Sequence, residues 1–310
     1  NVQYNSVIEA LDAQTIYDVP LLMHKEKLDQ RVLSKLKLPA KSVTNISGWR
    51  DFLSRHKNPT DEVTIGLIGK YVELPDAYMS IAESFVHAGA QNECGVKLEY
   101  ISSEKLNSKN AKKELAHLDG ILVAPGFGER GIMGKIAAAK VAREIKIPFF
   151  GICLGLQCAV IEFARNVLKM KGAASTEMQT NPTHPVIDLM EDQKKITMMG
   201  GTMRLGAYDC HIKKGTKAYQ AYGKLKISER HRHRYEFNNK YLRQFEKAGM
   251  IASGKNPETK LVEIMELKDH PWFLGTQYHP ELKSTVLNPQ KLFVRFVKAA
   301  QEYKKTKTQN

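Results

Sequence analysis

The sequence predicts an α/β fold: a mostly parallel, twisted sheet flanked by helices, with an antiparallel extension. From Val63 onward, short β-rich apolar runs alternate with longer amphipathic stretches, as in βαβ units around a parallel sheet. Beyond residue 170 the pattern becomes more β-like, which indicates an added antiparallel edge. The chain has 310 residues, of which 42% are hydrophobic, so it can bury a core of this size.

The elements of the parallel part follow from hydrophobic periodicity. Strands are expected where short apolar runs occur, at residues 63–68, 96–101, 120–124 and 147–150. Helices are expected where apolar residues recur at helical spacing, at residues 76–90, 110–117, 131–144 and 154–164. The later strands are expected at residues 195–199, 203–212, 261–267 and 272–278, with a closing helix at 289–303.

The first 60 residues have a different sequence pattern from the rest. They show no repeated βα unit and contain a charged stretch from His24 to Lys41. We therefore divide the chain into residues 1–60, a linker with an attached remnant, and residues 61–310, the α/β domain. The chain begins at Asn1, without a methionine, and we expect it to be a piece of a longer protein.

The formal net charge is +14, which could indicate a nucleic-acid footprint, an acidic partner surface or a solvated basic face. The lysines are scattered along the chain. The densest basic cluster, Arg230–Arg234, has no glycine-aromatic motif of an RNA-binding module beside it. We therefore expect no nucleic-acid partner.

Two further classes of protein are disfavoured. The sequence contains no apolar run of about 18 residues and no basic-then-apolar leader, so we expect a cytoplasmic protein without a membrane partner. Its cysteines are Cys94, Cys153, Cys158 and Cys210. They form no Cys-x-x-Cys pair and have no His-rich partner at zinc spacing, so free thiols and no metal site are expected.

Cys153 has the context of a catalytic nucleophile. It lies in Gly151-Ile152-Cys153-Leu154-Gly155, between an expected strand and an expected helix. This is the thiol version of the nucleophile elbow, a turn so tight that the flanking residues must be glycines. The helix N-terminus favours the reactive thiolate over the thiol. A buried structural cysteine is the alternative, and Cys94 and Cys158 fit that description better.

His279 and Glu281 are the expected partners of the nucleophile, because a cysteine nucleophile needs a base and a group that orients it. His279 ends an apolar strand, and Glu281 follows two residues later. In an extended chain, residues i and i+2 point to the same side about 6.5 Å apart, so the carboxylate can reach the imidazole. By itself a His-Pro-Glu tripeptide would be read as a surface turn.

The developing oxyanion needs hydrogen-bond donors, usually two backbone N–H groups. The elbow supplies the first, the N–H of Leu154. The glycine-rich loop 125–131 follows another strand and is placed to supply the second, from Gly126.

These residues together resemble the class I (triad) glutamine amidotransferases, which hydrolyse glutamine through a γ-glutamyl thioester and pass ammonia to a partner site. Within that class, four strings resemble the CTP synthase family and not GMP synthase or anthranilate synthase: Gly69–Tyr78, Gly200–Gly206, Glu229–Glu236 and His270–Phe273. The resemblance covers about residues 60–300 and implies a flavodoxin-like fold. Residues 7–36 look like the end of the family's synthetase domain and the interdomain linker.

The resemblance assigns the nucleophile to Cys153, the base to His279 and the orienting acid to Glu281. It places the contacts to L-glutamine on five residues, Gly126, Leu154, Gln157, Glu177 and Arg234. Glu177 would hold the α-ammonium group of the substrate and Arg234 its carboxylate. It also implies GTP as an activator, near Phe127, Arg230 and Arg232.

One departure from the family pattern concerns the oxyanion loop. The family commonly reads Pro-Gly-Gly-Phe-Gly, whereas this chain has Ala124-Pro125-Gly126-Phe127-Gly128. The glycine nearest the substrate is retained, but Pro125 fixes φ just before it.

The resemblance also implies an amidoligase half that binds UTP, ATP and magnesium and forms a homotetramer. The string Gly66–Tyr71 is too short for a phosphate loop and lacks the hydroxyl that would bind magnesium. We expect this chain to carry glutamine hydrolysis and docking to the amidoligase domain, but not UTP amination. Two alternatives remain open, a γ-glutamyl peptide hydrolase and a catalytically idle docking or regulatory module.

Overall fold

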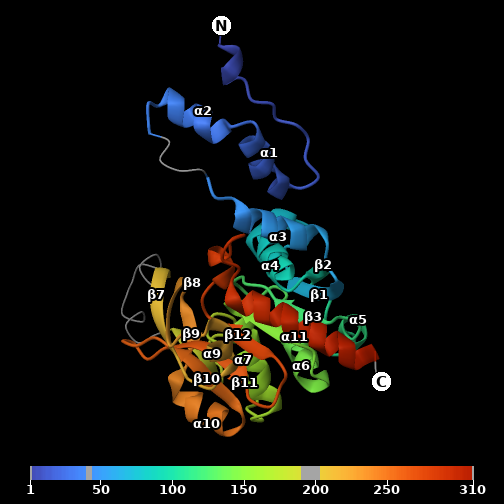
Figure 1. Cartoon of the computed structure of the whole chain (residues 1–310). Coiled ribbons are helices and arrows are strands. Elements are labelled where there is room, and N and C mark those ends of the chain that lie inside the picture. The colour runs from blue at the N-terminus through green and yellow to red at the C-terminus, as the bar shows by residue number, and fades with distance from the viewer. Residues whose placement is uncertain (1, 40–43, 190–202, 309–310) are drawn as a thin grey trace.

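A nine-stranded mixed sheet forms the centre of the protein in a computed structural model that describes residues 2–39, 44–189 and 203–308 (Figure 1). The strand order is β2-β1-β3-β4-β12-β11-β10-β7-β8. The first five are parallel neighbours: β2 (Cys94–Ser102), β1 (Asp61–Gly69), β3 (Gly120–Val123), β4 (Phe149–Ile152) and β12 (Phe273–Thr276).

The remaining four strands pair antiparallel: β11 (Val262–Leu267), β10 (Met250–Lys255), β7 (Arg204–Ile212) and β8 (Lys226–His233). The predicted fold class, a mostly parallel sheet with an antiparallel extension, is therefore confirmed. A small second sheet contains β5 (Ala173–Ser175), β6 (His184–Leu189) and β9 (Tyr235–Phe237).

Helices cover both faces of the large sheet. On one face lie α4 (Met79–Gln91) and α11 (Lys291–Thr308), which pack against each other and, in α11, against β1 and β3 (Figure 1). On the other face lie α5 (Ala111–Leu115), α6 (Ile132–Ile145) and α7 (Leu154–Asn166). Two short helices, α9 (Lys217–Tyr222) and α10 (Leu242–Lys247), accompany the antiparallel part.

Strand β4 shows how one strand supplies both cores. Its successive side chains point to opposite faces of the sheet, as strand geometry requires. Phe149 stacks on Phe273 with ring centroids 4.2 Å apart, on the α6 and α7 side. Phe150 meets Phe293 and Phe296 of α11 edge-on. Aromatic side chains therefore pack on both faces of β4, the strand that leads to Cys153.

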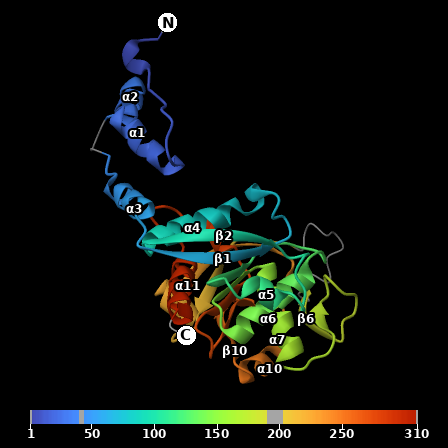
Figure 2. The same ribbon diagram turned by 90° about the vertical axis from the view of Figure 1, so that its right-hand side faces the viewer.

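The residues before β1 form three helices, α1 (Val19–Lys25), α2 (Leu28–Lys35) and α3 (Ser47–Lys57). None of these helices was expected from the sequence. Helix α3 packs on α4, whereas α1 and α2 lie beyond α3, away from the sheet (Figure 2). The division at residue 60 stays a prediction.

Tyr17 anchors this segment. Its ring is buried among Phe52, Leu53 and Ala90, and its backbone oxygen accepts a hydrogen bond from Trp49 Nε1 at 2.8 Å. Its hydroxyl bonds to His87 Nε2 of α4 at 3.1 Å, and His87 Nδ1 bonds to Ser284 Oγ at 3.0 Å. The segment before α1 is thereby connected to the chain just after Glu281.

Most predicted elements lie within a few residues of their expected bounds. The helix expected from residue 76 begins at Met79, because Pro75–Tyr78 forms a 3-10 turn. Strands β8 and β10 and the small sheet were not predicted. The expected strand at 195–199 and the string residues 200–202 lie outside the described residues.

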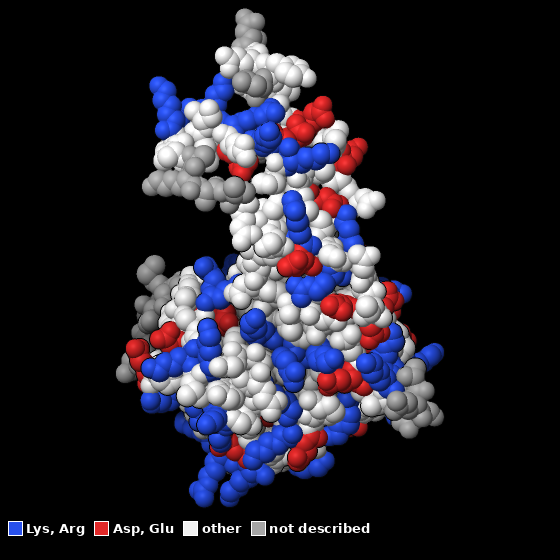
Figure 3. Space-filling view, in the orientation of Figure 1, with Lys and Arg blue, Asp and Glu red and all other residues white. Residues whose placement is uncertain are grey.

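Charged side chains are spread over the surface. On the face in Figure 3, Lys and Arg lie over all parts of the molecule, with Asp and Glu between them. Within residues 2–39, 44–189 and 203–308, no helix is long and apolar enough to cross a membrane.

Phe149→Ala should lower the free energy of unfolding by about 3–5 kcal/mol, because it removes a fully buried ring and leaves a cavity beside Phe273. Urea denaturation of the 310-residue chain measures this change. The control Leu225→Ala, at an exposed position, should stay within about 0.5 kcal/mol of the parent. An equally small effect at Phe149 would contradict the packing described for β4.

Candidate active site

Cys153 occupies a strained turn between β4 and α7. Its backbone angles are φ 52° and ψ −102°, a region that residues with a Cβ rarely adopt. Such strain costs on the order of 1–3 kcal/mol and persists only where surrounding structure enforces it. A Cβ on Gly151 would lie 2.7 Å from the carbonyl carbon of Gly155, and one on Gly155 would lie 2.2 Å from Val123 O. The elbow predicted from the two glycines is confirmed.

The elbow is tied directly to the neighbouring strand. The Cys153 N–H donates to Thr276 O at 2.7 Å, which continues the parallel register that pairs Ile152 with Thr276. Because parallel strands end at the same edge of a sheet, the residues just after β12 lie beside the nucleophile. His279 is three residues past Thr276, so this register brings the two together.

His279 and Glu281 form the predicted pair, with His279 Nδ1 and Glu281 Oε1 2.8 Å apart. The local conformation differs from the extended chain that we expected. Pro280–Lys283 is a 3-10 turn, because Pro280 fixes φ at its first position. The turn rather than the strand brings the carboxylate to the imidazole. The His279 backbone N–H also donates to Arg230 O at 2.8 Å, which ties the turn to β8.

His279 is held in its charged form. Burial alone would lower its pKa, but the adjacent Cys153 and the Glu281 carboxylate outweigh burial and raise the pKa to about 10. The ring is therefore an imidazolium at neutral pH, with Glu281 accepting the Nδ1 proton. An imidazolium beside a thiol stabilises the thiolate form of that thiol.

A buried glutamine that sequence analysis missed supports the nucleophile. Gln277 Nε2 lies 3.7 Å from Cys153 Sγ, within donor distance for sulfur. Gln277 Oε1 accepts a hydrogen bond from Gln157 Nε2 at 3.3 Å, and Gln157 also donates to Tyr235 O at 3.1 Å. Gln157, predicted to contact the substrate, therefore orients Gln277. The position of Gln277 two residues before His279 could have indicated this role.

A pocket of about 580 Å³ opens over these residues. Cys153, His279 and Gly126 all line it. Leu154 is the first residue of α7, so its N–H belongs to the first helical turn, where N–H groups lack intrahelical partners. The two predicted oxyanion donors are therefore on the loop and the helix end that border Cys153.

Other predicted contacts line the same pocket: Gln157, Glu177, Arg234, Phe127 and Arg232. Glu177 Oε1 accepts a hydrogen bond from the Gly128 N–H at 3.0 Å, which joins it to the oxyanion loop. Phe127 is 67% exposed and forms part of the rim. Arg230 is not among the residues that line this pocket.

The basic cluster at residues 230–234 is divided between two faces of a strand, which sequence analysis did not predict. Along β8 the arginines are exposed and the histidines are buried. His231 Nδ1 and His233 Nε2 are 2.8 Å apart. Burial first, and then neighbouring positive charge, lower the pKa of His231 to about 3 and also lower that of His233. Both rings are therefore neutral.

A buried charge network lies behind this strand. Arg204 donates to Glu236 at 2.8 Å and to Glu263 at 2.9 Å. Burial raises the pKa of Glu236 to about 8 and also raises that of Glu263, although Arg204 opposes both shifts. One arginine of β7 therefore serves two glutamates, one in β9 and one in β11, beside the strand that carries His233.

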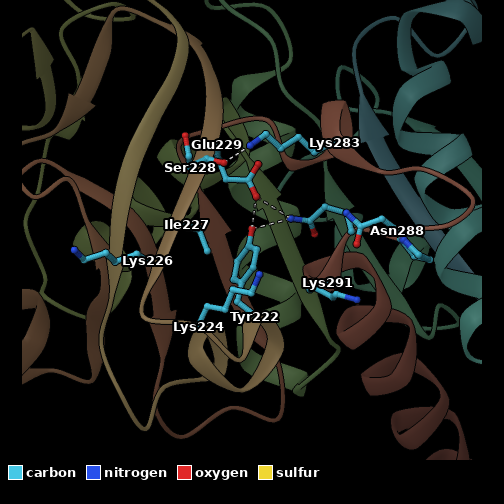
Figure 4. Close-up of a pocket in the computed structure, with 11 residues that line it drawn as sticks. Tyr222, Lys224, Lys226, Ile227, Ser228, Glu229, Lys283, Asn288 and Lys291 are labelled. Carbon is cyan, nitrogen blue, oxygen red and sulfur yellow. Dashed lines mark hydrogen bonds between the residues drawn. The ribbon is translucent and has the colours of Figure 1, made fainter.

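A second pocket, of about 360 Å³, contains no residue of the Cys153, His279 and Glu281 triad (Figure 4). Four lysines line it: Lys224, Lys226, Lys283 and Lys291. At its centre, Tyr222 OH donates to Glu229 at 2.9 Å, and burial raises the Glu229 pKa to about 7. In the described part of the chain, no group of three or more His, Cys, Asp and Glu residues could hold a metal ion.

Gly155→Ala should disrupt the elbow, because the added methyl group would lie 2.2 Å from Val123 O. We expect a loss of about 1–3 kcal/mol in unfolding free energy and a clear fall in the rate at which iodoacetamide alkylates Cys153. Urea denaturation and mass spectrometry measure the two effects. Gly95→Ala is the control, because its methyl group would make contacts no shorter than 3.6 Å. Equal behaviour of the two variants would refute the steric explanation.

Comparison with known proteins agrees with this geometry. The model of the glutamine amidotransferase class-I family matches residues 73–299. The CTP synthase of Cytophaga hutchinsonii is 67% identical over 307 residues, 99% of this chain and 57% of that protein. The CTP synthase of Christiangramia forsetii is 63% identical, over 98% of this chain and 56% of that protein. The chain thus spans little more than half the length of these curated relatives.

Among solved structures, the glutaminase domain of Trypanosoma brucei CTPS with bound acivicin superimposes with a TM-score of 0.73. The two sequences are 38% identical. The superposition includes 77% of this chain and 94% of that structure. The chain belongs to the class I glutamine amidotransferases, and its α/β domain is a glutaminase domain of the CTP synthase type.

Proposed function

We propose that this domain hydrolyses L-glutamine to glutamate and ammonia through a thioester on Cys153. The observation that carries the proposal is the hydrogen-bonded His279–Glu281 pair, held beside the elbow cysteine in a pocket of about 580 Å³. A thiolate beside an imidazolium is ready to attack an amide carbon and to protonate the departing nitrogen.

In the first half-reaction, the Cys153 thiolate attacks the carboxamide carbon, a C–S bond forms and the carbonyl electron pair moves to oxygen. The N–H groups of Leu154 and Gly126 would receive that oxyanion. The His279 imidazolium gives its proton to the amide nitrogen, the C–N bond breaks and ammonia leaves. A γ-glutamyl thioester and a neutral imidazole remain.

In the second half-reaction, neutral His279 takes a proton from water as the water oxygen attacks the thioester carbon. The tetrahedral intermediate collapses and the C–S bond breaks. Glutamate leaves, its γ-carboxyl proton passing to solvent, and the thiolate and the imidazolium are restored. Glu281 keeps the Nδ1 proton oriented throughout.

Glu177 and Arg234 are the proposed contacts to the amino-acid end of glutamine. Both line the pocket, on different elements. Glu177 already accepts the Gly128 N–H, but a carboxylate has room for several donors, so it can also receive an α-ammonium group. Arg234 would pair with the α-carboxylate, for which a guanidinium fork is suited.

For the whole protein we propose CTP synthesis: an amidoligase half, outside this chain, would use the ammonia to aminate UTP with ATP and magnesium. The curated relatives are CTP synthases, and this chain covers 57% and 56% of their length. GTP activation near Phe127, Arg230 and Arg232, homotetramer formation and a cytoplasmic location also remain proposals. Lys70 gives no support to nucleotide binding at residues 66–71, because its Nζ donates to Phe127 O.

Cys153→Ala should abolish glutamate release from glutamine, because no other described cysteine lines the pocket. A coupled glutamate assay measures turnover, and Cys94→Ser is the control because Cys94 lies in β2. A glutamine-mimicking electrophile should add one adduct to the parent chain, at Cys153. Turnover that survives in Cys153→Ala would remove Cys153 from the mechanism. Preference for γ-glutamyl peptides would favour the peptide hydrolase, and absence of both turnover and adduct would favour an idle module.

Glu281→Gln should shift the alkaline limb of kcat/KM for glutamine to lower pH. The parent imidazolium persists up to its pKa of about 10, and both contributions of Glu281 raise that value. Without the carboxylate, burial lowers the His279 pKa and the general acid is lost earlier as pH rises. A pH–rate profile tests this, with the exposed Glu258→Gln as control. An unchanged limb, or one shifted upward, would contradict the assigned role of His279.

A further inference from the structure

Lys135 is a lysine buried completely inside the domain. It lies in α6, and its side chain is 0% exposed. Burying a lysine is costly unless its charge is compensated. No ion pair with Lys135 occurs in residues 2–39, 44–189 and 203–308. Its Nζ instead donates to two backbone carbonyls, Ala124 O at 2.6 Å and Pro125 O at 3.4 Å. The charge is thus directed at the loop that follows β3.

This loop is the one that carries the proposed oxyanion donor. The Pro125 carbonyl and the Gly126 N–H belong to one planar peptide unit, in which they point in opposite directions when the bond is trans. The ammonium group holds Ala124 O closely and also lies within 3.4 Å of Pro125 O on the α6 side, so the Gly126 N–H of that second peptide points to the opposite side. Gly126 lines the pocket that contains Cys153 and His279.

The side chains around Gly126 restrict the loop further. A Cβ atom on Gly126 would lie 3.3 Å from Leu154 Cδ2, a tight contact, and 3.5 Å from Lys135 Nζ, so Gly126 is packed between the start of α7 and the ammonium group. At the next residue, Lys70 Nζ donates to Phe127 O, and the Gly128 N–H of that same peptide donates to Glu177. Lysines thus hold carbonyls on both sides of Gly126.

The charge of Lys135 also acts on the strength of the donor. A cation at a carbonyl oxygen draws electron density along the peptide, so the N–H of that peptide becomes a stronger donor to an anion. This effect is large where water is excluded, as it is around this fully buried side chain.

The geometry points to Lys135 as a positioning residue for glutamine hydrolysis, which orients and polarises the Pro125–Gly126 peptide so that its N–H receives the oxyanion formed at Cys153. The inference rests on the proposed function. Lys135 does not line the pocket, and its role is to orient a backbone N–H that does face it. This role explains why a charged lysine occupies an apolar helix face.

Lys135→Met is the main test, because methionine fills a similar volume without a charge or a donor. We expect kcat for glutamine to fall about 10²–10³-fold, as when one oxyanion donor is lost, with KM changed less than about threefold. Lys140→Met, a partly exposed position on the same helix, is the matched control and should behave as the parent. Steady-state glutamate release measures all three proteins.

A second reaction separates positioning from a general structural effect. Alkylation of Cys153 by iodoacetamide displaces iodide at a saturated carbon, so no oxyanion forms. Lys135→Met should therefore alkylate within about threefold of the parent rate while hydrolysing glutamine far more slowly. Equal losses in the two reactions would mean a displaced nucleophile and would overturn the inference. If the parent itself hydrolyses no glutamine, the proposed function fails instead.

The parent chain offers a test that needs no variant. Burial lowers the pKa of Lys135 to about 8; Lys70 acts in the same direction, while Cys158 and Cys153 oppose it. As pH rises through about 8, the ammonium is lost and its hold on Pro125 O weakens. We expect kcat to fall there, at lower pH than the separate limb that His279 sets near its pKa of about 10, while the rate of Cys153 alkylation does not fall. If Lys135→Met does not fold, parallel pH profiles for the two parent reactions would still refute the inference.

Discussion

The hydrogen bond from the Cys153 N–H to Thr276 O is the contact on which the site depends. It continues the parallel pairing of β4 and β12 by one residue past the end of β4, at the point where the chain turns sharply into α7. This bond joins Cys153, in its strained conformation, to the last residue of β12. The imidazole and the carboxylate then reach the thiol through a short turn. The side chains of Cys153 and His279 meet because the Cys153 N–H and Thr276 O are hydrogen-bonded.

Local steric rules explain which parts of this arrangement the sequence could predict. Gly151 and Gly155 predicted the elbow correctly, because a Cβ at either position would overlap backbone atoms. The parallel strands were found because they are continuous apolar runs. His279 and Glu281 were paired correctly for a partly wrong reason: a 3-10 turn after Pro280, not an extended chain, joins them. The two-residue spacing identified His279 and Glu281, whereas the turn between them depends on Pro280.

Features formed by buried polar residues were not predictable in this way. Strand β8 alternates arginine with histidine, and because both are polar the burial of the histidines left no hydrophobic pattern. Arg204 meets Glu236 and Glu263 from other strands, which requires the antiparallel register to be known. Lys135 occupies a helix whose spacing suggested an ordinary amphipathic face. Its role depends on a loop that comes earlier in the chain and is adjacent only in the folded domain.

Helix α4 connects two distant parts of the chain. Its His87 bonds on one side to Tyr17, in the segment before α1, and on the other to Ser284, just after the turn that holds Glu281. Ser84 of the same helix donates to Glu281 O at 3.4 Å. The N-terminal segment and the turn that carries Glu281 are therefore both bonded to α4. If residues 16–18 move away from α4, His87 loses its hydrogen bond to Tyr17, and the helix that also contacts Glu281 and Ser284 is less well held.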